Sequence, residues 1–328
     1  MSRYWHTVKY LRFNSQSISI RGHRFSLHKN IEILPKKKEF TVVRIAPSGF
    51  AGKRRLERII IPFTVKSIGE CAFYNCTSLR EVILPELLSD IECKAFARCS
   101  MVTSFKLPLK LKKIQRSTFE DCTSLSEINL SRIEVIEPLA FRNCRSLAFV
   151  DIQNATAIAD GAFSSCTALS DIKMPSKACN ISVKAFDGCP IVTSDLFWKN
   201  DLLIVDGWLL ACKSQGDYVT IDADVKYIAH DAFENIIRDL RVPDPKYEEN
   251  LKWYDEQLFL YHNWYHCPGS GPIADPGEPP KKFLDVKVPI KIHYNGTLAD
   301  WEQIVIATSA DAYPVEIMAK DGCKQTTI

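Results

Sequence analysis

The chain has 328 residues, of which 46% are hydrophobic and 25% charged, with a formal net charge of +3. The basic residues are interspersed with acidic ones, so neither the charge nor its distribution predicts a nucleic-acid-binding surface. No run of about 18 apolar residues occurs, so we expect no membrane-spanning helix and no membrane insertion.

The amino-terminal segment lacks the features of a secretory signal. Residues 1–22 contain neither an apolar stretch of about 7–15 residues nor a small-residue cleavage site. From the sequence alone we therefore expect either a cytoplasmic location or an export signal that lies outside the given sequence.

Residues 1–44 precede the regular part of the chain and are predicted to form an N-terminal cap. Ile20 and Phe25 are five residues apart, like the isoleucine and phenylalanine of each later unit, so we interpret residues 18–44 as a degenerate repeat. Ile31 follows Phe25 as Leu56 follows Phe50, which assigns it to the position of Leu56 in that repeat. A terminal repeat must differ from the others because one of its sides meets water.

Phenylalanine recurs at intervals of 22 or 23 residues through the middle of the chain, and an isoleucine lies five residues before each one. Self-similarity at this period predicts stacked supersecondary units, which are typical of a repeat solenoid. The repeating residues are Phe50, Phe73, Phe96, Phe119, Phe141, Phe163 and Phe186, with Phe233 two periods later.

Each unit combines a strand pattern with a turn pattern. Val82 and Leu84 alternate with Glu81 and Ile83, which predicts a short strand with two inward and two outward side chains. The apolar residues before this strand are three apart, which suits a turn of α- or 3₁₀-helix on the return path: Phe73, Cys76 and Leu79. Stacked units would pair their strands about 4.8 Å apart in a parallel sheet that lines one face of a curved solenoid.

The phrases AFYNCTSLREVILP, TFEDCTSLSEINL, AFRNCRSLAFVDI and AFSSCTALSDIKMP resemble the BspA-like leucine-rich repeats of bacterial surface proteins. The resemblance covers roughly residues 45–240, and IHYNGTLADWEQI (292–304) is similar to the strand–helix module that often closes such proteins. It implies an α/β solenoid of the leucine-rich-repeat horseshoe type. It also implies adhesion or protein binding, a mostly extracellular or cell-surface location, and no catalytic residues. The absence of a signal segment departs from this family pattern.

Two segments interrupt or follow the repeats. The apolar runs on either side of Asp206-Gly207 predict a hairpin inserted at about residues 196–222 of the solenoid, which spans 45–240. Residues 241–282 are predicted to be an aromatic insertion followed by a Pro/Gly-rich linker. Residues 283–328 are predicted to be a C-terminal cap with a strand over 286–292 and a short helix near 297–305.

Twelve cysteines are present, and six of them occupy one repeat position. We interpret these six as free thiols that fill the core, since a spacing of 22 or 23 residues is not a zinc pattern. His262 and His266 precede Cys267 in an arrangement that could bind a metal, but no further ligand is apparent, so neither metal nor cofactor is predicted. The six residues are Cys76, Cys99, Cys122, Cys144, Cys166 and Cys189.

The outward strand positions form the first candidate site, because the concave sheet of a solenoid is its usual recognition surface. The predicted partner-binding residues are Arg58, Ile60, Glu81, Ile83, Lys106, Glu127, Phe149, Asp151, Asp171 and Lys173. An ordinary solvated sheet face with scattered apolar residues is the alternative interpretation. The aromatic insertion 253–265 is the second candidate, since stacked rings suit sugars and partner hot spots, or it caps the last coil. Its residues are Trp253, Tyr254, Tyr261 and Trp264.

The sequence is compatible to different degrees with three functions. A non-catalytic scaffold that binds a protein partner through the concave sheet face is favoured. A carbohydrate-binding or adhesion module that uses the aromatic insertion is the alternative. An enzyme is disfavoured because the sequence contains no G-x-S-x-G, H-E-x-x-H or P-loop pattern.

Overall fold

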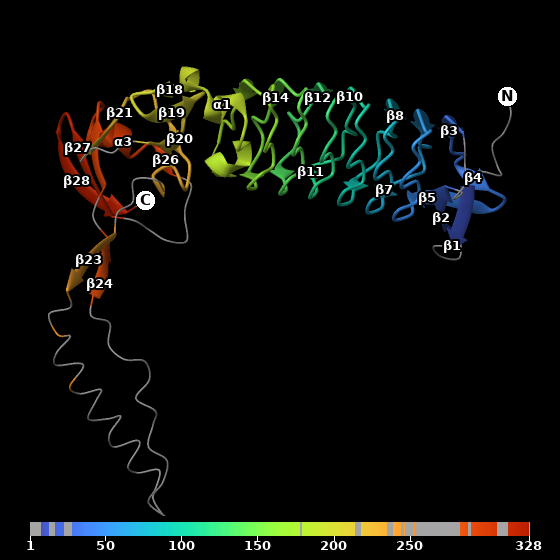
Figure 1. Ribbon diagram of the computed structural model, residues 1–328, viewed down its shortest axis with the longest axis horizontal. Coiled ribbons are helices and arrows are strands. Elements are labelled where there is room, and N and C mark those ends of the chain that lie inside the picture. The colour runs from blue at the N-terminus through green and yellow to red at the C-terminus, as the bar shows by residue number, and fades with distance from the viewer. Residues whose placement is uncertain are drawn as a thin grey trace, which may run out of the picture.

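The computed structural model describes residues 8–12, 17–22, 28–177, 179–213, 218–234, 239–243, 246, 252, 283–287, 290–306 and 314–327. The chain winds into coils that stack side by side in one row, with the N-terminal strands at one end and the C-terminal strands at the other (Figure 1). The predicted repeat solenoid is confirmed.

The predicted parallel sheet is present, and its strands belong to successive coils. The sheet is interrupted twice, between β8 and β10 and between β12 and β14. Parallel pairing joins β3, β6 and β8 in one part, β10 and β12 in the next, and β14 and β16 in the last. We call the outward side of these strands the strand face. Its strands are β3 (Asn30–Glu32), β6 (Arg58–Ile60), β8 (Glu81–Ile83), β10 (Ser104–Phe105), β12 (Glu127–Ile128), β14 (Phe149–Asp151) and β16 (Asp171–Lys173).

A second row of parallel strands, which the sequence did not predict, runs along the opposite edge of the stack (Figure 1). It is also interrupted, since β5, β7 and β9 pair in one sheet and β11, β13, β15 and β17 pair in another. Most of its strands are two residues long and end at the repeat isoleucine, so they show no alternation that a sequence pattern could reveal. Its strands are β5 (Phe40–Ile45), β7 (Ser67–Ile68), β9 (Asp90–Ile91), β11 (Lys113–Ile114), β13 (Val135–Ile136), β15 (Ala157–Ile158) and β17 (Asn180–Ile181).

The repeat phenylalanines form a continuous column inside the stack. From Phe50 to Phe186 each side chain is 0% exposed, and neighbouring ring centroids are 5.1–5.9 Å apart with nearly parallel planes. The backbone follows the same spacing, since the N–H of Phe73 donates to the carbonyl of Ala95 in the next coil at 2.7 Å. Each coil is therefore covered on both sides by its neighbours, which is why no single coil could bury its apolar side alone.

The expected turn of helix on the return path is wrong for most coils. Consecutive turns replace it: the N–H of Cys76 donates to Phe73 and that of Leu79 donates to Cys76. Residues with positive φ two positions before and after each phenylalanine from Phe50 to Phe163, such as Cys71 and Asn75, prevent the turns from continuing as a helix. The coil of Phe186 does have a 3₁₀-helix, η2 (Val183–Phe186).

The N-terminal strands extend the stack beyond the first regular coil. β1 (Val8–Arg12) and β4 (Lys36–Lys37) pair antiparallel with β2 (Ser17–Gly22) and β5 respectively. β2 runs parallel to β5 with Ile20 opposite Ile45, as a degenerate repeat requires. The assignment of Ile31 was wrong, because it lies opposite Ile59 in the strand and not at the position of Leu56.

The predicted hairpin is confirmed. β19 (Leu202–Val205) and β20 (Trp208–Cys212) are antiparallel, and both residues of the turn have positive φ, 49° for Asp206 and 78° for Gly207, as a type I′ turn requires. β18 (Trp198–Lys199) pairs with the outer edge of β19. β20 runs parallel to β22 (Tyr227–Ile228), so the hairpin supplies a strand where a regular coil would supply one. The short helices α1 (Pro190–Thr193) and η3 (Asp195–Phe197) lead into it.

The chain ends in a sheet that contains both parallel and antiparallel pairs. β21 (Tyr218–Ile221), β25 (Ile290–Tyr294), β27 (Pro314–Ala319) and β28 (Gly322–Thr327) form it in this order, while β26 (Val305–Ile306) pairs with β22. The strand predicted over 286–292 is instead divided between β24 (Phe283–Lys287) and β25, and β24 pairs with β23 (Asp239–Pro243). The predicted helix is α3 (Leu298–Trp301), which begins with a capping box between Thr297 and Asp300. Nearly all of 241–282 lies outside the described residues, so the domain boundaries there remain predictions.

The phenylalanine column predicts a large difference between two substitutions of the same residue type. Phe141→Ala should lower the free energy of unfolding by about 3–5 kcal/mol, because it removes a fully buried ring from between two others. Phe149→Ala on the strand face, where the ring is 42% exposed, should change it by less than about 1 kcal/mol. Urea denaturation followed by circular dichroism measures both, and equal losses would contradict the column as the main source of stability.

Candidate partner-binding face

The predicted outward residues all lie at the surface of the strand face. Arg58, Ile60 and Asp151 are half-buried and the remaining seven are exposed, whereas the intervening Ile59 and Val150 are 0% exposed. The alternation that separated inward from outward side chains is therefore confirmed for these strands, while their role in binding stays a prediction.

Two pairs of charged residues on this face neutralise each other across neighbouring coils. Arg58 Nε lies 2.5 Å from Glu81 Oε2, and Lys173 Nζ lies 3.9 Å from Asp151 Oδ2. Each pair occupies directly opposed positions of adjacent parallel strands. Both pairs remain accessible to solvent and contribute little to stability, and their charges already partly compensate each other before any partner binds.

The rest of the strand face consists of apolar side chains and of charged side chains without an ion pair. Ile60 lies opposite Ile83 in the adjacent strand, as predicted, and Ile83 and Phe149 are 37% and 42% exposed. No ion pair involves Lys106, Glu127 or Asp171 within the part of the chain that the structure describes. These apolar side chains and single charges are the groups with which a partner would gain most by contact.

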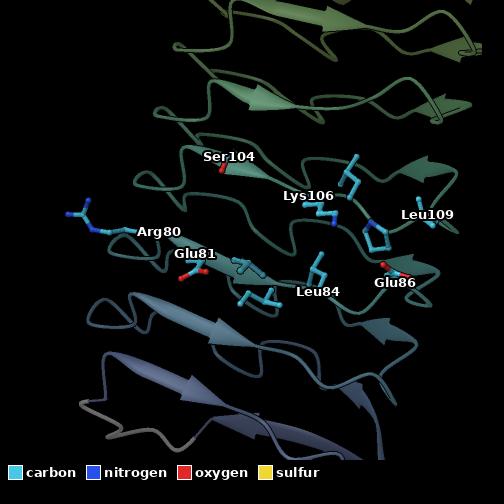
Figure 2. A pocket seen from close by; sticks show the side chains of 11 residues that line it. Arg80, Glu81, Leu84, Glu86, Ser104, Lys106 and Leu109 are labelled. Atoms are coloured by element: carbon cyan, nitrogen blue, oxygen red, sulfur yellow. The ribbon is translucent and has the colours of Figure 1, made fainter.

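A groove of about 350 Å³ opens between β8 and β10, which the sequence did not reveal. Figure 2 shows Arg80 and Glu81 at one end, Glu86 and Leu109 at the other, and Leu84 and Lys106 between them. The groove is also lined by Val82, Ile83, Ser104, Leu107 and Pro108. Three predicted residues, Glu81, Ile83 and Lys106, thus line one concave site. The other lining residues do not belong to the predicted set.

The second candidate site lies outside the described residues. Trp253, Tyr254, Tyr261 and Trp264 have no described placement, and the same holds for His262, His266 and Cys267. The proposed sugar site and the weak metal pattern therefore stay predictions.

The six repeat cysteines line the core as thiols and form no disulfide. Each Sγ lies 3.0–3.2 Å from the carbonyl oxygen of the phenylalanine in the preceding coil, so the thiol donates to a buried backbone acceptor. Burial raises the pKa of Cys76 and of Cys122 to about 12, and it raises the pKa of Cys99 and Cys144 well above the ordinary value. These thiols therefore stay protonated at neutral pH, which excludes them as nucleophiles or metal ligands.

One cluster resembles a catalytic arrangement in composition only. Ser182 donates a short hydrogen bond to Asp231, while His230 Nδ1 lies 2.9 Å from the carbonyl oxygen of Ile181. The serine thus contacts the carboxylate directly and the imidazole contacts a carbonyl, which is not the order of a nucleophile, base and orienting acid. Lys184 and Glu234 form an ion pair in the same region. These contacts join residues 181–184, before the hairpin, to residues 230–234, after it.

Within the described ranges, no three His, Cys, Asp or Glu side chains gather as metal ligands would. Among the helices that the structure describes, none has the length and apolar character needed to cross a lipid bilayer.

Comparison with known proteins agrees with the repeat geometry. A family model described as a BspA type Leucine rich repeat region matches in six copies over residues 43–157 and 134–262. The crystal structure of the T. pallidum leucine rich repeat protein is similar with 29% identity and a TM-score of 0.50, over 53% of this chain and 83% of that one. A leucine-rich repeat protein from Bacteroides ovatus is similar with 24% identity and a TM-score of 0.53, over 68% of this chain and 60% of its own, and shows the fold alone. No curated protein sequence matches the chain.

The burial of the six repeat cysteines predicts selective alkylation. With iodoacetamide at about pH 8, the native protein should be labelled at the exposed Cys323 and left unlabelled at the six repeat cysteines, because all six are buried in the core and out of reach of the reagent. Peptide mapping by mass spectrometry identifies the labelled sites, and unfolding in urea should make all six reactive. Native labelling of the six at the rate of Cys323, or disulfides among them, would contradict the packing role.

Proposed function

This chain belongs to the BspA type leucine rich repeat family, and we propose that it is a non-catalytic scaffold that binds a protein partner through the strand face. The family is typical of protein-interaction or surface scaffolds, which supports binding in general and leaves the partner open. The location of the contact on this chain is argued from its own residues.

The observation that carries the proposal is the exposure of large apolar side chains at outward strand positions. An outward position on a solvated sheet normally holds a polar residue, and isolated exposed apolar residues need no explanation. Here Ile60 and Ile83 adjoin each other on paired strands, and Phe149 lies 42% exposed on the same face. Their rigid strands hold these side chains in place without a partner, so little conformational entropy is lost when a partner covers them.

The charge pattern supports a protein in preference to a polyanion. Acidic and basic residues alternate on the face, and two of the pairs, Arg58 with Glu81 and Asp151 with Lys173, already compensate each other. A face with mixed charges around apolar side chains has the composition of a protein interface, whereas a nucleic acid would require a net basic stripe.

The test is the double variant Ile83→Asp with Phe149→Asp. Placing a carboxylate at both apolar positions should reduce capture of the native partner by at least about tenfold, since each desolvated charge opposes binding. Affinity capture from the native cell and its surroundings, followed by quantitative mass spectrometry, identifies the partner and measures the loss.

The matched control is Leu196→Asp, which replaces a leucine that is 92% exposed and belongs to η3, not to any of the strands that form the strand face. It should capture the partner as the unmodified chain does, and both proteins should retain their circular dichroism spectra. A double variant that still captures the partner at full strength would refute the strand face as the contact.

A further inference from the structure

The groove between β8 and β10 is a local break in the sheet, and it coincides with a change of residue inside the core. The inward strand position holds isoleucine or valine in the neighbouring coils, but Phe105 occupies it in β10. Its ring meets Phe96 and Phe119 edge-on, each at 4.8 Å, and these two rings have the widest spacing of the column, 5.9 Å. β10 pairs with β12 and has no ladder to β8, although every residue from 80 to 109 is described, and β12 and β14 are likewise not paired with each other.

The break exposes part of the apolar core. Inward strand residues in the other regular coils are at most 8% exposed, from Ile59 at 0% to Ile128 at 8%. In contrast, Val82, Leu84 and Leu107 are half-buried, although the sequence places them at the same inward positions. The floor of the groove is therefore the solenoid core itself, which at other coils is closed to solvent.

The loops that follow the strands add exposed apolar side chains next to the groove. Leu109 lines the groove and is 53% exposed, and Leu87 and Phe63 are 58% and 74% exposed in the loops of the two preceding coils. The corresponding loop positions in the next coils are polar, Arg132 and Asn154. Apolar surface on this edge is thus confined to the coils next to the groove.

The charged residues that line the groove differ in whether they form an ion pair. Glu81 is held by Arg58 at 2.5 Å, whereas neither Arg80 nor Lys106 forms an ion pair with any side chain that the structure describes. Glu86 at the far end is the one lining carboxylate without a described ion pair. The end that carries Arg80 therefore favours a negative charge on whatever occupies the groove.

From these observations we infer that the groove binds an extended peptide segment of a protein partner, in which an acidic residue is flanked by apolar residues. The groove follows two strands from Arg80 to Glu86, a length of about 20 Å that matches an extended segment of six or seven residues. Apolar side chains of the segment cover Leu84, Leu107 and Leu109, and its carboxylate lies between Arg80 and Lys106. This assignment rests on the proposed function and specifies which part of the strand face makes the contact and with what chemistry.

The experiment uses two pools of synthetic peptides, about nine residues long, labelled with fluorescein. Both pools carry valine, leucine, isoleucine or phenylalanine around the centre, and the central residue is aspartate in one pool and lysine in the other. Fluorescence anisotropy with the full chain should show the aspartate pool binding at least about tenfold more tightly. The variants Arg80→Glu and Leu109→Glu should each remove most of this binding, and Arg80→Glu should also favour the lysine pool.

Two matched variants test whether the loss belongs to the groove. Arg132→Glu reverses an exposed cation on a later coil, and Leu196→Glu places a charge at an exposed leucine in η3. Both should bind the aspartate pool as the unmodified chain does. Equal binding of the two pools, absence of binding, or equal losses in groove and control variants would overturn the inference.

Other occupants give different results. Binding to vesicles of phosphatidylglycerol that depends on Leu109, without peptide binding, would identify a lipid surface. A dimer in sedimentation that Leu109→Glu dissociates would identify a second copy of this chain. Either result overturns the peptide assignment. If a native partner is lost with Ile83→Asp and Phe149→Asp but retained by Arg80→Glu and Leu109→Glu, the proposed function stands and the groove assignment fails.

Discussion

Coil-to-coil stacking is the interaction on which the whole structure depends. The phenylalanine rings of successive coils lie 5.1–5.9 Å apart, and the same spacing lets each turn donate backbone hydrogen bonds to the next. Neither set of contacts exists within one coil, so folding must order several coils together before burial offsets the loss of conformational entropy. The cysteine thiols follow the same logic, since each one satisfies a buried carbonyl of its neighbour and not of its own coil.

The period of the stack explains why so much of the fold was predictable. Once Phe73 and Ile68 are aligned with their equivalents, alternation along Glu81–Leu84 separates inward from outward side chains in every coil at once. The outward exposure of Ile83 and Phe149 followed from this rule, as did the opposition of Ile60 and Ile83. The hairpin was predictable for a different reason, because Asp206-Gly207 tolerates the positive φ that a type I′ turn demands.

Features that depend on contacts between coils could not be read from any single segment. The second row of parallel strands consists mostly of strands such as Ser67–Ile68, too short to show alternation. The hydrogen bond between Ser182 and Asp231 joins residues 49 positions apart, and no local sequence pattern links them. The groove lies beside the coil in which Phe105 packs between two other rings, and the sequence shows this phenylalanine but not the opening of the sheet.

A repeat solenoid gives every coil nearly the same surface, and this uniformity works against specific recognition. A partner that contacted only the repeated features would bind at several registers along the row with similar free energies. Register becomes unique only where the repeat departs from itself. Phe105 provides such a departure, because the sheet opens beside it and exposes Leu84 and Leu107 at one place in the row. Arg80 and Lys106 then add charge at that same place, so both shape and electrostatics distinguish this coil from its neighbours.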